Sequence, residues 1–175
     1  MIPHNPRSKD CQPRQVRAET AFSLQRRRIL LADDDPQIRE SLAGVLVEEG
    51  FLVLPAANGA EALAIASTSV VSLVILDLNM PVKNGWDTFE RLSTDYPLLP
   101  VIIATARPNQ LFTAASAGVG ALLEKPLDIP HLLATIRQLL NEPSEVQLRR
   151  VTGHEAPFNY HPATRNRDSR IDGVL

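Results

Sequence analysis

A small set of polar residues in the middle of the chain has the types and the placement needed for phosphoryl transfer. Asp33 and Asp34 follow one apolar run, Asp77 follows another, and Thr105 and Lys125 come after two more. A carboxylate can act as the nucleophile that forms an aspartyl phosphate, and a lysine ammonium can pair with the transferred group. Paired carboxylates are typical Mg²⁺ ligands. These residues therefore predict phosphoryl capture on Asp77, with Mg²⁺ held by the acid pair and phosphate contacts from the hydroxyl and the ammonium.

The segments that must position these side chains are five apolar runs, each of strand length. They are Ile29–Ala32, Leu52–Leu54, Leu73–Leu76, Val101–Ala104 and Ala121–Leu123. The runs lack the alternation of a half-exposed strand, which indicates burial on both faces of a parallel sheet. Because the carboxyl ends of parallel strands lie along one edge, we expect the polar residues that follow them to meet there.

Segments with helical periodicity separate the runs. One apolar stripe consists of Ile38, Leu42, Val45 and Leu46, and another lies between Leu132 and Leu140. Asp35 and Asp128 are expected to cap these helices, and Gly50 is expected to follow the end of the first one. The repeated alternation predicts an α/β fold, a doubly wound five-stranded parallel sheet with helices on both faces.

The composition is that of one globular domain with appendages. The chain has 175 residues, of which 44% are hydrophobic and 22% are charged. Residues 1–28 hold seven Lys or Arg against two Asp or Glu, residues 29–140 hold six against thirteen, and residues 141–175 hold five of each. We therefore divide the chain into a flexible basic arm (1–28), one domain (29–140) and a disordered tail (141–175). In this tail only residues 144–152 favour a helical turn or two.

Several classes of protein are not expected from this sequence. No apolar run approaches the roughly 18 residues of a membrane helix, and the N-terminus lacks the pattern of a secretory signal. Cys11 is the only cysteine, so an internal disulfide cannot form. A cytoplasmic protein without a membrane partner is the expectation.

Residues 29–140 resemble the receiver domain of two-component response regulators, the family of the bacterial chemotaxis regulator. The resemblance rests on Ile29–Pro36 (ILLADDDP), Leu73–Pro81 (LVILDLNMP), Asn84-Gly85, Thr105-Ala106 and Leu123–Pro126 (LEKP). It implies a flavodoxin-like sheet with strand order 2-1-3-4-5. It also implies that the chain is a phosphorelay switch, which makes protein–protein contacts and catalyses only its own phosphorylation and dephosphorylation.

The resemblance assigns Mg²⁺ ligands and a phosphoacceptor. Asp34 would bind the metal directly and Asp33 mainly through water, beside Asp77 and the backbone carbonyl of Asn79. Asp77 would receive the phosphoryl group from a histidine kinase or a histidine phosphotransfer protein.

The resemblance also assigns the residues that respond to the phosphate. Thr105, followed by Ala106, would move toward the phosphate, and Lys125 would pair with it. The bond between Lys125 and Pro126 is often cis in this family.

Three positions depart from common family patterns. Leu122 stands where many relatives carry a Tyr or Phe that rotates on activation, and Asn84 replaces a usual Asp. Gly120 and Ala121 stand where one subfamily of transcription factors has two aspartates for its dimer salt bridges. We therefore expect a heterologous protein target, not yet identified, and a monomer or weak dimer.

Two alternative functions fit parts of the pattern. The chain could be a receiver-like interaction module that is not phosphorylated. Against this alternative, the polar residues expected for phosphoryl transfer are all present: Asp33, Asp34, Asp77, Thr105 and Lys125. It could instead be a Mg²⁺-dependent phosphatase with an Asp nucleophile, although the first strand lacks the Asp-x-Asp motif of such enzymes. Nucleic-acid binding is not expected, because the basic arm has no interleaved aromatic residues and no recognised nucleic-acid motif.

Overall fold

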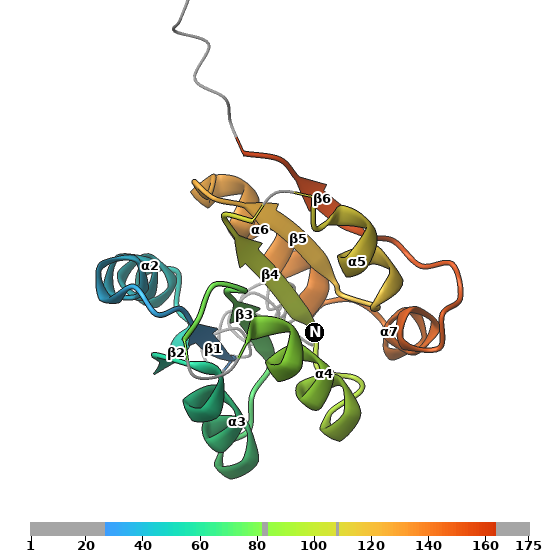
Figure 1. The fold of residues 1–175 in the computed structure, drawn as a ribbon, viewed down its shortest axis with the longest axis horizontal. Helices are drawn as coiled ribbons and strands as arrows, with labels where there is room; N and C mark the ends of the chain where they lie inside the picture. The colour runs from blue at the N-terminus through green and yellow to red at the C-terminus, as the bar shows by residue number, and fades with distance from the viewer. Residues whose placement is uncertain (1–26, 82–83, 108, 164–175) are drawn as a thin grey trace, which may run out of the picture.

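The computed structural model describes residues 27–81, 84–107 and 109–163, which form an α/β fold (Figure 1). Its elements in chain order are β1 (Arg28–Ala32), α2 (Pro36–Glu48), β2 (Leu52–Ala56), α3 (Gly59–Thr68), β3 (Leu73–Leu76), α4 (Gly85–Asp95), β4 (Val101–Thr105), α5 (Leu111–Ser116), β5 (Ala121–Glu124), α6 (Ile129–Leu140), α7 (Ser144–Val151) and β6 (Asn159–His161). The sheet is parallel throughout, with the order β2-β1-β3-β4-β5-β6. The expected order of the first five strands is confirmed, and a sixth strand extends the sheet.

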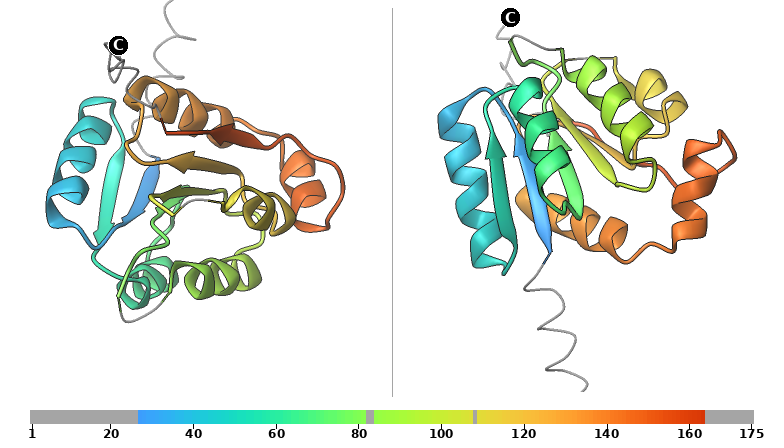
Figure 2. Two further views of the ribbon diagram at one scale, coloured as in Figure 1. Left: turned by 45° about the horizontal axis from the view of Figure 1, so that its top comes forward. Right: turned by 90° about the horizontal axis from the view of Figure 1, so that it is seen from below.

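Two helical layers cover the sheet, as the two views of Figure 2 show. Helices α2 and α6 bury Leu42, Leu46, Leu132 and Ile136 in the core on one face. Helices α3, α4 and α5 bury Ala62, Phe89, Leu92 and Ala114 in the core on the other face. Burial on both faces explains the continuous apolar character of the central strands. Among the described residues, no helix is both long and apolar enough to cross a membrane.

The helix signals read from the sequence act as expected. The Asp35 side chain accepts hydrogen bonds from the N–H groups of Gln37 and Ile38 at the start of α2. Asp128 caps α6 by accepting from the N–H of His131. Gly50, two residues after the end of α2, has a φ of 88°, which glycine adopts without steric cost.

The strand β2 is an exception to the predicted burial. It lies at the edge of the sheet, and Leu52 is 49% exposed. Pro55, which has no N–H to donate to a neighbouring strand, is tolerated at such an edge. The expectation of burial on both faces is therefore wrong for β2, because a run of three apolar residues does not distinguish an edge strand from a central one.

The chain after Asn141 differs from the expected disordered tail as far as residue 163. Residues 144–151 form α7, and residues 159–161 form β6, which pairs in parallel with β5. The strand β6 was not predicted from the sequence, because it is only three residues long and none of its residues is aliphatic. Of the expected basic arm, Arg27 and Arg28 are described, and Arg28 begins β1; residues 1–26 and 164–175 lie outside the described residues.

Candidate functional site

The strand order brings four chain segments to one edge of the sheet. Asp33 and Asp34 follow β1, Asp77 follows β3, Thr105 ends β4, and Lys125 follows β5. Backbone hydrogen bonds extend the ladders to this edge: the N–H of Asp77 donates to Ala32 O at 2.9 Å, and that of Lys125 donates to Thr105 O at 2.9 Å. The residues that the sequence placed at separate strand ends are therefore held next to one another.

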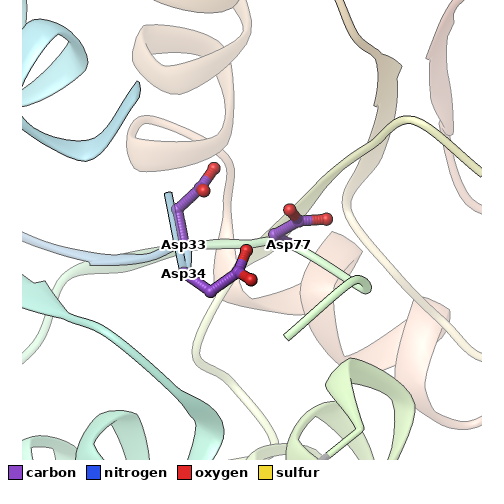
Figure 3. A group of neighbouring side chains, drawn as sticks. All are labelled: Asp33, Asp34 and Asp77. Carbon is purple, nitrogen blue, oxygen red and sulfur yellow. The ribbon is translucent and has the colours of Figure 1, made fainter. Parts of the chain in front are cut away.

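Three carboxylates form the centre of the site (Figure 3). One carboxylate oxygen from each of Asp33, Asp34 and Asp77 lies within 4.8 Å of the others. Asp33 and Asp77 are 3% and 4% exposed, whereas Asp34 is exposed. The N–H of Asp35 donates to Asp33 Oδ1 at 3.0 Å. Asp34 is therefore the carboxylate of this cluster that solvent reaches most easily.

Lys125 compensates part of this negative charge. Its Nζ lies 2.6 Å from Asp33 Oδ2 and 2.7 Å from Asp77 Oδ2. Burial lowers the pKa of the Lys125 ammonium, but the hydrogen bonds and charges of the two carboxylates outweigh this effect and leave the pKa raised. Lys125 is therefore a cation at neutral pH, in contact with the side chain expected to receive the phosphoryl group.

The end of β4 contributes a hydroxyl, and the loop after it contributes a guanidinium. Thr105 is fully buried, and its Oγ1 accepts a hydrogen bond from the N–H of Arg107 at 3.0 Å. Arg107 Nε donates to Asn79 Oδ1, while the N–H of Asn79 donates to Asp77 Oδ1 at 3.0 Å. Arg107 was not predicted from the sequence, where its only signal is its position two residues after Thr105. Ala106 lies between the two and is exposed.

The loop after β3 packs so closely against the start of α4 that only glycine fits there. A Cβ on Gly85 would lie 2.5 Å from Asp77 O and 2.5 Å from Leu78 Cα, both backbone atoms. Asn84 accepts a hydrogen bond from the N–H of Trp86 at 3.1 Å and so caps α4. The Asn84-Gly85 pair therefore fixes the backbone that carries Asp77.

The donor set fits Mg²⁺. The ion prefers oxygen ligands and is usually bound by one or two carboxylates. Asp34, Asp33 and Asp77 supply such oxygens from two neighbouring strand ends. The backbone carbonyl of Asn79 remains a predicted ligand. The Lys125–Pro126 peptide bond, named from the sequence as a cis candidate, is cis.

A family model described as the response regulator receiver domain matches residues 29–137. Among curated proteins, the chain is 42% identical over 115 residues to the transcriptional regulatory protein CpxR of Klebsiella pneumoniae, an alignment that covers 65% of this chain and 49% of CpxR. It is 35% identical over 149 residues to the response regulator MprA of a Mycobacterium species, covering 84% of this chain and 60% of MprA. The chain thus spans about half the length of the curated relatives it matches.

Solved structures show the same similarity. A CheY-like receiver domain protein from Methanospirillum hungatei superposes with a TM-score of 0.64 at 30% identity, covering 68% of this chain and 96% of that one. The response regulator TrrA from Thermotoga maritima, solved in complex with Mg²⁺-BeF, gives a TM-score of 0.61 at 31% identity, covering 65% of this chain and 98% of that one.

Proposed function

The chain belongs to the response regulator receiver family, and on that premise we propose that it is a phosphoacceptor switch of a two-component phosphorelay, phosphorylated on Asp77. One observation carries the proposal: the buried Asp77 carboxylate lies at the acidic edge of the sheet and is paired with Lys125 at 2.7 Å. Buried carboxylates in mutual contact are unfavourable unless a cation compensates them. Such a cluster is suited to bind Mg²⁺ and a phosphoryl group.

The proposed reaction needs little covalent chemistry from the protein. A carboxylate oxygen of Asp77 attacks the phosphorus of a phosphohistidine, the O–P bond forms as the P–N bond breaks, and the electron pair returns to the imidazole nitrogen. Mg²⁺, when bound, neutralises charge on the phosphoryl oxygens. Asp33 and Asp34 would hold the ion, and the Asn79 N–H holds the Asp77 side chain in place.

Two side chains respond to the new phosphate in this proposal. Lys125 exchanges part of its pairing with Asp77 for a phosphate oxygen, since its ammonium already lies against that carboxylate. The Thr105 hydroxyl donates its hydrogen to another phosphate oxygen. Both residues lie at the ends of neighbouring strands, so their movement reaches the loops that a partner can contact.

A groove beside the site supports the proposed phosphodonor, a histidine kinase or a histidine phosphotransfer protein. The groove has a volume of about 390 Å³ and lies between α2 and the segment after β5. It is lined by Gln37, Ile38, Ser41, Leu42, Val45, Lys125, Pro126, Leu127 and Ile129. A donor protein seated on its apolar lining would bring a phosphohistidine to the Lys125 end of the groove.

We also propose that the phosphorylated chain acts on a heterologous protein target and that it is located in the cytoplasm.

Intact-mass spectrometry after incubation with acetyl phosphate and Mg²⁺ tests the proposal. The wild-type chain should gain one phosphoryl group, Asp77→Asn should gain none, and Asp87→Asn, a matched change outside the cluster, should behave as wild type. Full phosphorylation of Asp77→Asn would contradict the assignment. A wild-type chain that takes up no phosphate would favour the interaction module, and sustained turnover of phosphate esters would favour a phosphatase.

A further inference from the structure

The segment of residues 157–163, here called the C-terminal strap, lies along the outer edge of β5. Its strand β6 pairs with β5 in the register Ala121 with Asn159, Leu122 with Tyr160 and Leu123 with His161. Figure 1 shows β6 beside β5, on the side of β5 away from β4. The strap therefore occupies an edge that would otherwise present unpaired backbone groups to a partner.

Side chains at the end of β5 and the start of α6 fasten the strap. The Glu124 carboxylate accepts hydrogen bonds from Tyr160 Oη at 2.9 Å and from the N–H of Ala163 at 3.1 Å. The ring of His161 stacks on that of His131, with centroids 3.9 Å apart. Glu124 thus holds the strap at two points beyond the backbone ladder.

The helix that precedes the strap is anchored separately. Arg150 in α7 forms a bidentate ion pair with Glu142 at 2.8 and 2.7 Å, and both side chains are nearly buried. Arg150 also donates to Pro157 O at 2.9 Å, where the strap begins. Such a pair resists opening, because separating it would leave a buried charge uncompensated. A three-residue edge strand, by contrast, belongs to the part of a fold that opens most easily.

Glu124, which holds the strap, directly precedes Lys125, the cation of the acidic site. Glu124 and Lys125 are consecutive, and Lys125 Nζ pairs with Asp77. Across the β4–β5 ladder, Glu124 stands opposite Thr105, and the Lys125 N–H donates to Thr105 O at 2.9 Å. A displacement of Thr105 or Lys125 toward a phosphate would therefore reach the Glu124 carboxylate through one register pair or one peptide bond.

We propose that the C-terminal strap is an intramolecular cover of the β5 edge that phosphorylation of Asp77 releases. The inference rests on the proposed function. Phosphorylation replaces the single charge of the Asp77 carboxylate with about −1.5 to −2 charges on the phosphoryl group, which attract Lys125 and the Thr105 hydroxyl. Their displacement moves Glu124 away from Tyr160 and Ala163, and residues 159–163 keep only their short ladder and their ring contacts.

Hydrogen exchange on the full chain, with and without acetyl phosphate and Mg²⁺, tests this coupling. The backbone amides of Asn159, Tyr160, His161 and Ala163 should exchange at least about fivefold faster after phosphorylation, the lower end of coupling between linked sites. Amides of α7 should not change, because the ion pair of Arg150 does not involve the site. Tyr160→Phe should accelerate exchange in the strap without a phosphodonor, whereas Tyr96→Phe, a matched change outside the strap, should not.

Intact mass measured on the same samples separates the possible failures. Full phosphorylation of Asp77 with unchanged or slower exchange in the strap would overturn the inference and leave the proposed function standing. Absence of phosphate on Asp77 would overturn both. Equal acceleration of α7 and the strap would show general loosening of the C-terminal region and would also overturn the inference.

Discussion

Lys125 Nζ and Asp77 Oδ2 lie 2.7 Å apart, although 48 residues separate them in the chain. The contact joins the ends of β3 and β5, two strands that are not neighbours in the sheet. Among the described residues, Lys125 is the only cation that forms an ion pair with a carboxylate of the cluster, and it lies directly on the expected phosphoacceptor. The ion pair therefore serves both the stability of the resting state and the proposed response to phosphate.

Loss of Lys125 is predicted to destabilise the fold. Lys125→Ala leaves the buried carboxylates of Asp33 and Asp77 without their cation, which should lower the free energy of unfolding by about 3 kcal/mol. Lys125→Arg keeps the positive charge, so it should lower the free energy of unfolding by less. Urea unfolding without Mg²⁺ measures both, and added Mg²⁺ should restore part of the loss in Lys125→Ala. A loss below about 1 kcal/mol, the size expected of an exposed ion pair, would contradict the prediction.

Asp33 and Asp34, the two cluster carboxylates after β1, are predicted to contribute unequally to metal binding. Asp34 is exposed and available as a direct ligand, whereas Asp33 is already engaged by Lys125 and by the Asp35 N–H. Asp33→Ala should weaken Mg²⁺ binding about tenfold, as expected of a supporting partner, and Asp34→Ala should weaken it more. Fluorescence of Trp86, which directly follows Gly85, can report the titration. Equal affinities in the two variants would disprove the division of roles.

The close contact at Gly85 predicts that adding a methyl group to this residue destabilises the fold. Gly85→Ala forces a Cβ against the backbone of Asp77 and Leu78, which should lower the free energy of unfolding by about 1–3 kcal/mol and slow phosphorylation. Gly44→Ala is the control, because a Cβ added at this position of α2 would meet no atom within 4 Å apart from its chain neighbours and the nearby backbone of its own helix. That change should stabilise the protein by up to about 1 kcal/mol through helix propensity. Similar effects of both changes would mean that the contact at Gly85 is unimportant.

A pH dependence is predicted for Tyr160. The hydrogen bond to Glu124 is the main cause that raises the pKa of Tyr160, because a phenolate there would lie beside a carboxylate. A raised pKa in the folded state means that this contact stabilises the strap below pH about 10 and is lost as the pH rises further. Tyrosinate absorbance in a Tyr96→Phe background follows Tyr160 alone. Glu124→Gln should move the midpoint to lower pH, and an unchanged midpoint would contradict the assigned cause.

Much of the fold and the residues of the candidate site could be predicted from the sequence. Three apolar runs, which end before Asp33, Asp77 and Thr105, form strands whose residues are buried on both faces of the sheet. A continuous run of apolar residues predicts such burial directly. The N-caps at Asp35 and Asp128 could also be predicted from the sequence, because a capping hydrogen bond joins groups within three residues of each other. Once the strands are parallel, the convergence of their polar ends follows from the geometry of the sheet.

The tertiary structure alone decided which distant groups meet. The pairing of Lys125 with both Asp33 and Asp77, and the hydrogen bond from Arg107 to Asn79, join residues with no local relationship in the chain. The strand β6 also lacked a sequence signal, because Glu124, more than 30 residues away, helps to hold it. The periodicity of apolar residues predicts which residues are buried. Only the folded chain determines which distant groups the polar side chains contact.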